Sequence, residues 1–153
     1  MQNVQSLPLH INDVLCDPIK MASNIICLTE TSLKSKDWAG WSQFNDFSIY
    51  QVCRNEKQKT HKKKKKKKKT HNENQKGSGG VALLIRNSFL SRADESMSYD
   101  SFEMVTAVLN THADDSDNFV VSALYKDHAI KKSDFLDGMK AVFEILRRPY
   151  GLR

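Results

Sequence analysis

The sequence lacks three features that would point to a membrane or secreted protein. It has no uninterrupted run of about 18 apolar residues, so no transmembrane helix is predicted. Its opening residues, Met1 to Gln5, show no basic region followed by an apolar core, so no signal peptide is predicted. Its three cysteines, Cys16, Cys27 and Cys53, are an odd set without metal-ligand spacing. We therefore expect a reduced intracellular protein, nuclear or cytoplasmic, that is not secreted and does not bind a membrane.

The net positive charge comes from one segment. The chain has 24 Lys and Arg residues against 18 Asp and Glu, a formal net charge of +6. Lys62 to Lys69 is an unbroken run of lysines, and without these eight the 16 remaining basic residues leave a net charge of −2. The high isoelectric point is therefore no evidence for a nucleic-acid-binding fold, because the body of the chain is slightly acidic.

The lysine run lies within a low-complexity insert, residues 55–76. This segment consists mainly of Lys, Asn, Gln, Thr and His and has no large apolar residue, so it is predicted to be a disordered loop. Thr-His pairs flank the run on both sides, which suggests expansion of a repetitive tract. Its lysines could contact nucleic-acid phosphates without reading sequence, although a solvated loop of no selected function is the favoured interpretation. They are Lys62, Lys63, Lys64, Lys65, Lys66, Lys67, Lys68 and Lys69.

The rest of the chain alternates apolar runs with turn signals. Helices are predicted from Leu7 to about Asp17, where Pro18 breaks the pattern, and over Ser133–Leu146, before Pro149. Between them, Trp38 to Phe44 is interpreted as a loop or short helix, and Arg86–Asp100 as a polar connection. Strands are predicted at Ile25–Leu28, Phe47–Cys53, Val81–Ile85, Phe102–Leu109 and Phe119–Leu124. This order favours an α/β fold with one mixed sheet region and helices on its outer faces.

A lone carboxylate, Glu30, follows the apolar run Ile25–Leu28. The run is typical of a strand buried on both faces, so Glu30 is expected at the rim of a sheet, where layered α/β proteins place ligand sites. A carboxylate there is stabilised by a cation or a hydrogen-bond donor. The alternative is an ordinary strand-end glutamate that caps the next turn.

Four short motifs follow in a suggestive order. They are Asn3-Val-Gln-Ser-Leu7, Leu28-Thr-Glu-Thr31, Gly79-Gly-Val-Ala82 and the strand that ends at Tyr125. In this order they resemble the endonuclease/exonuclease/phosphatase superfamily, and most closely the endonuclease domain of non-LTR (LINE-type) retrotransposons. The resemblance implies a partial four-layer α/β sandwich, with residues 1–153 forming an incomplete domain that corresponds to the N-terminal half.

The resemblance also implies roles for three residues. Glu30 would be a metal ligand for Mg²⁺, Asn3 would hold the metal or a neighbouring ligand, and Tyr125 would hydrogen-bond the scissile phosphate of DNA. Taken singly, these residues have simpler interpretations, as a cap, a terminal residue and a strand-end aromatic. Other functions remain open: a phosphodiesterase acting on a lipid or sugar phosphate, or a non-enzymatic nucleic-acid-binding protein that uses its lysine run.

The sequence departs from the family pattern in two respects. Tyr125 is followed by Lys-Asp-His-Ala rather than by proline, and His128 within this segment matches no catalytic position, so it is interpreted as a solvated loop residue. The family's later Gly-Asp-Phe-Asn and Ser-Asp-His segments do not occur, and the strand expected before Asn3 is missing. We therefore expect a fragment that is inactive as given.

Deleting Lys62–Lys69 should abolish retention of the chain on DNA or heparin at low salt, because the remainder carries a net charge of −2. For the intact chain, log affinity should fall with log salt with a slope approaching about −0.9 per phosphate contacted. Retention on a heparin column and salt-dependent DNA titrations measure this. Unchanged DNA binding after the deletion would show that a folded surface makes the contacts.

Overall fold

The computed structural model describes residues 1–34, 38–53, 79–93, 97–99, 102–110, 118–126 and 130–150. Four strands form the first sheet in the order β1-β2-β4-β3. The bounds are β1 Gln2–Asn3, β2 Ile25–Thr29, β3 Phe47–Val52 and β4 Val81–Arg86. Strand β1 runs parallel to β2, whereas β4 lies antiparallel to both β2 and β3, so this sheet is mixed.

The second sheet is built around the long strand β7, which pairs antiparallel with β5, β6 and β8. The bounds are β5 Leu90–Ala93, β6 Met97–Tyr99, β7 Phe102–Asn110 and β8 Asn118–Tyr125. The predicted strands at 81–85, 102–109 and 119–124 are thus confirmed. The expectation of one sheet region was wrong, because β7 and β8 pair with each other and not with β2 or β4.

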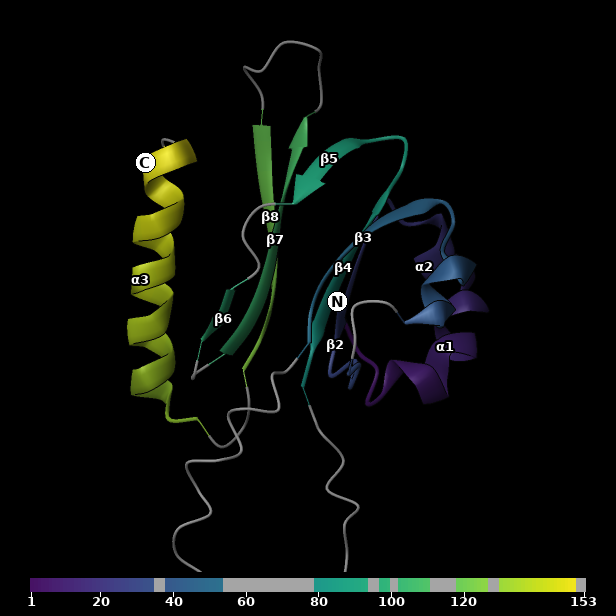
Figure 1. Ribbon diagram of the computed structural model, residues 1–153, viewed down its shortest axis with the longest axis horizontal. Coiled ribbons are helices and arrows are strands. Elements are labelled where there is room, and N and C mark those ends of the chain that lie inside the picture. Colours follow the sequence, from purple (N-terminus) through teal and green to yellow (C-terminus); the bar gives the residue numbers. More distant parts are fainter. Residues whose placement is uncertain are drawn as a thin grey trace, which may run out of the picture.

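The helices cover the outer faces of the two sheets (Figure 1). Helices α1 (Leu7–Leu15) and α2 (Pro18–Ala22) and the short 3-10 helix η1 (Ala39–Gln43) lie beside the first sheet, while α3 (Lys132–Tyr150) lies beside the second. The fold is therefore mixed α/β with two facing sheets. Within the described residues, no helix is long and apolar enough to cross a membrane.

Strand β4 is buried on both faces, as its uninterrupted apolar sequence predicts. Ala82 and Leu84 pack in a cluster that includes Leu7 and Val14 of α1. The intervening Val81, Leu83 and Ile85 pack in a second cluster with residues of β7 and β8. Because side chains alternate along a strand, this one strand joins the helical layer to the space between the sheets.

A third, smaller cluster joins the second sheet to α3. Phe102 and Met104 of β7 pack with Val142, and the ring of Phe102 meets that of Phe135 edge-on with centroids 5.8 Å apart. Residues 102 and 104 lie on the opposite face of β7 from Val105, which packs between the sheets. The apolar face by which the sequence predicts the last helix therefore packs on the outer face of the second sheet.

Several predicted boundaries need correction. Strands β5 and β6 fall in residues 86–100, which were interpreted as polar connection; their sequences are too short and polar to show a strand pattern. The strand described as missing before Asn3 is present as β1, a two-residue strand that contains Asn3 itself. Helix α3 begins at Lys132 and ends at Tyr150, beyond the predicted stop before Pro149, so the proline lies in the final turn. The lysine insert and His128 lie outside the described residues.

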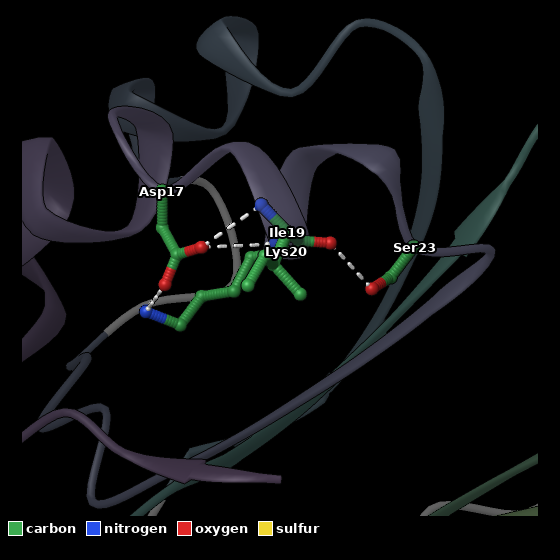
Figure 2. A network of polar contacts seen from close by, with 4 residues as sticks. All are labelled: Asp17, Ile19, Lys20 and Ser23. Carbon is green, nitrogen blue, oxygen red and sulfur yellow. Dashed lines mark hydrogen bonds and ion pairs between the residues drawn. The ribbon is translucent and has the colours of Figure 1, made fainter.

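The predicted break at Pro18 is confirmed, but the chain re-forms a helix there. Asp17 is the N-cap of α2 and its Oδ1 accepts hydrogen bonds from the backbone N–H groups of Ile19 (3.0 Å) and Lys20 (3.1 Å). Pro18 occupies the first helical position, where a missing N–H has no consequence. The Lys20 ammonium pairs with Asp17 Oδ2, and Ser23 donates to the carbonyl of Ile19 at 2.8 Å (Figure 2).

Helix α2 should weaken at low pH. The hydrogen bonds from Lys20, through its side chain and its backbone amide, hold the pKa of Asp17 below its ordinary value of 3.8. Because the folded-state pKa is depressed, the stabilisation is complete above pH 3.8 and is lost as pH falls through the folded value. The chemical shifts and hydrogen-exchange rates of the Ile19 and Lys20 amides, followed by NMR as the pH is lowered, measure this loss of stabilisation.

Asp17→Asn should remove this pH dependence while keeping an acceptor for the helix cap. Asp137→Asn is the matched control, because Asp137 also pairs with a lysine three residues later but in an exposed position on α3. If the amides of α2 respond to pH in the same way in wild type and Asp17→Asn, the cap does not have the role assigned to it.

Candidate functional site

Glu30 lies in an irregular segment, residues 30–32, that follows β2 at the rim of the first sheet; this segment is named the Glu30 turn. The backbone of Glu30 is left-handed, with φ +56°, and Ser32 is also left-handed, with φ +53°. Non-glycine residues adopt this conformation at a cost of about 1–3 kcal/mol and keep it where the surroundings enforce it. The turn is therefore expected to be held by specific contacts.

The N-terminal segment supplies two of these contacts. Val4 N–H donates to the carbonyl of Thr29 at 3.0 Å and continues the pairing of β1 with β2. Ser6 N–H then donates to the Glu30 carbonyl at 2.8 Å, and Leu7 N–H to the Thr31 carbonyl at 2.9 Å. The start of α1 is thereby attached to the turn, so the Asn3–Leu7 motif and the Glu30 motif form one structural unit.

The glycine pair before β4 holds the other side of the turn. Thr31 N–H donates to the Gly80 carbonyl at 3.2 Å and Ser32 N–H to the Gly79 carbonyl at 2.8 Å. Gly80 has φ +90° and lies against the hydroxyl of buried Thr31, in a space where a Cβ atom would clash. Glycine is required here for both its backbone conformation and its lack of a side chain.

Tyr125 reaches Glu30 from the second sheet. The Tyr125 hydroxyl, at the end of β8, donates to Glu30 Oε1 at 2.7 Å, across 95 positions of sequence. The family resemblance of the motifs predicts both residues in one site, and the structure brings their side chains into direct contact. A phenol donating to a partly buried carboxylate fixes the direction of the carboxylate and leaves its second oxygen as a potential ligand.

Asn3 lies at the same rim but does not join this contact. It is exposed and stands opposite Thr29 in the β1–β2 register, one residue before Glu30. Its Oδ1 accepts a hydrogen bond from the backbone N–H of Gln5 at 3.1 Å, and among the described residues no hydrogen bond links it to Glu30. The structure thus shows Asn3 stabilising the connection between β1 and α1.

Glu103 was not among the residues that the sequence predicted for this site. This residue belongs to β7 and is only 6% exposed, and the other residues of β7 from 102 to 109 are buried as well. Its Oε2 accepts a hydrogen bond from Gly80 N–H at 2.5 Å. A carboxylate within a mainly apolar strand was the available signal, because a buried carboxylate needs hydrogen-bond donors.

Among the described cysteines and histidines, Cys27 and His10 have surroundings of their own. Cys27 is partly buried between the sheets, and burial raises the pKa of its thiol, in keeping with its interpretation as a small core residue. His10, on α1, lies 2.8 Å from Asp13 in an exposed pair. In the described part of the chain, no group of three or more His, Cys, Asp and Glu side chains is arranged to hold a metal.

No family model matches the chain, and no curated protein matches it. The features that bear on function are therefore the Glu30–Tyr125 contact, the turn that presents Glu30 and the four sequence motifs.

Gly80→Ala should destabilise the protein by about 2–5 kcal/mol. Left-handed backbone accounts for about 1–2 kcal/mol, and the clash with Thr31 for about 1–3 kcal/mol. Urea unfolding followed by circular dichroism measures the change. Gly138→Ala is the control, because Gly138 lies within α3 and has no left-handed backbone, so alanine there should stabilise the helix by about 0.5–1 kcal/mol. Equal effects at the two positions would contradict the assigned role of Gly80.

Proposed function

We propose that the Glu30–Tyr125 rim is a Mg²⁺-dependent phosphodiester site, and that the chain is part of a DNA endonuclease of the non-LTR retrotransposon type. The single observation that carries the proposal is the hydrogen bond from Tyr125 to Glu30. It joins the two residues to which the resemblance gives the phosphate and metal roles. The arrangement of helices, two facing sheets and helix is likewise compatible with a partial four-layer sandwich of this superfamily.

A single carboxylate at the rim suits Mg²⁺. This ion keeps several of its waters and binds proteins through one or two carboxylates together with substrate phosphates. Glu30 would supply that ligand through the oxygen not used by Tyr125. The bound ion would supply charge to offset the negative phosphate.

The protein residues position this chemistry. The left-handed turn, attached to Ser6, Leu7 and the glycine pair, fixes the backbone of Glu30 before any ligand binds. Tyr125 fixes the carboxylate in the unliganded site, and its single O–H would leave Glu30 when it donates to a phosphate oxygen. Preorganisation of this kind matters because reacting groups must be held within fractions of an ångström.

Binding without cleavage is the activity that these residues support. The described rim offers one carboxylate, one phenol and a nearby amide, and the one described histidine, His10, pairs with Asp13 on α1. A positioned general acid or base typically contributes about 10²–10⁴ to the rate of such a reaction. We propose that the chain binds cation and phosphate but turns over little substrate.

The purified chain should bind Mn²⁺, used as a spectroscopic substitute for Mg²⁺, and Glu30→Gln should abolish this binding. The amide has the same shape but lacks the negative charge that a hard cation requires. Electron paramagnetic resonance measures the free Mn²⁺. A supercoiled plasmid incubated with the chain and Mg²⁺ should remain intact.

Glu144→Gln is the matched control, because it makes the same charge change at an exposed position on α3. Equal loss of Mn²⁺ binding in both variants would show that general charge, rather than this rim, holds the ion. Nicking that disappears in Glu30→Gln would confirm the site and contradict the proposed inactivity.

A further inference from the structure

Glu103 lies on the face of β7 that is turned toward the first sheet. Alternation along the strand places it on the same side as Val105 and Ala107, which pack between the sheets. In the β7–β8 register it stands directly opposite Tyr125. Through Oε2 it accepts the N–H of Gly80. This buried carboxylate is therefore adjacent to both parts of the candidate site.

The contacts from Glu103 to Glu30 form a short chain. Glu103 fixes the amide of Gly80, the Gly80 carbonyl accepts Thr31 N–H, and Thr31 directly follows Glu30. Gly80 is buried, so its N–H group would be costly to leave unpaired, and the side-chain oxygen of Glu103 supplies the acceptor. The left-handed backbone of Glu30 is kept only where the surroundings enforce it in this way.

We propose that Glu103 is a positioning residue, which holds the Gly79–Gly80 pair and thereby keeps Glu30 in place to bind a divalent cation. This inference rests on the proposed function for the cation, but its structural part does not. Glu103 contacts neither cation nor phosphate and acts through Gly80 and Thr31. The network gives a structural reason for a carboxylate in this buried, mainly apolar strand.

Two substitutions separate positioning from packing. Glu103→Met fills a similar volume without an acceptor, whereas Glu103→Gln keeps an acceptor oxygen without the charge. In Glu103→Met, hydrogen-exchange protection of the Thr31 and Ser32 amides should fall about tenfold or more. The amides of Leu83 and Leu84, in the centre of β4, should keep their protection. Glu103→Gln should restore protection close to the wild-type level.

Mn²⁺ binding by the same variants tests the functional part. Loss of a residue that supports a metal ligand typically weakens metal affinity about 10–100-fold. Glu103→Met should show this loss, and Glu103→Gln should recover most of the affinity. Unchanged protection of Thr31 and Ser32 in Glu103→Met overturns the inference, as does lowered protection with unchanged Mn²⁺ affinity.

Other outcomes are equally decisive. If wild type binds no Mn²⁺ but Glu103→Met lowers protection of the turn, the proposed function fails and the structural role of Glu103 stands. If Glu103→Met does not fold, hydrogen exchange of the wild-type protein tests the inference instead. Protection of the Gly80 and Thr31 amides equal to that of Leu83 supports the network, and fast exchange at Gly80 overturns it.

Discussion

The turn at Glu30–Ser32 depends on hydrogen bonds from three separate parts of the chain. N–H groups of the N-terminal segment donate to the carbonyls of the turn, and the carbonyls of Gly79 and Gly80 accept hydrogen bonds from its N–H groups. Tyr125 orients the side chain of Glu30. Each of these segments is itself fixed by a sheet or helix. A conformation that is unfavourable in isolation becomes stable because the fold supplies all of these partners at once. The position of the one candidate ligand is therefore a property of both sheets.

The second constraint is the pair of buried faces on β4. Its residues contact the helical layer on one side and the second sheet on the other, so β4 fixes the distance between the layers. The glycine pair leads directly into this strand, and Glu103 reaches it from β7. Packing between the sheets and the geometry of the rim are consequently coupled, since a shift of β7 against β4 would displace Tyr125, on the strand paired with β7, relative to Gly80.

Much of this arrangement could be predicted from the sequence. Continuous apolar runs located β2, β4, β7 and β8, and Pro18 located the break between the first two helices. The convergence of Glu30 and Tyr125 was predicted only through resemblance, because residues 95 positions apart carry no local signal of contact. The division into two sheets was missed, since strand pairing is set by tertiary packing and not by the pattern of any one strand. Glu103 was missed because its partner is a backbone amide.

The site also explains how a long, low-complexity insert is tolerated between β3 and β4. Val52 and Val81 are direct partners in the ladder, so the described residues on the two sides of the insert lie at adjacent positions beside the Glu30 turn. Closing a connection between fixed ends costs only about 0.6 kcal/mol more for each doubling of its length. The sheet pairing and the bond from Ser32 to Gly79 fix the re-entry point whatever the intervening sequence. Lengthening there is therefore nearly neutral for stability, whereas a change at Gly79 or Gly80 acts directly on the rim.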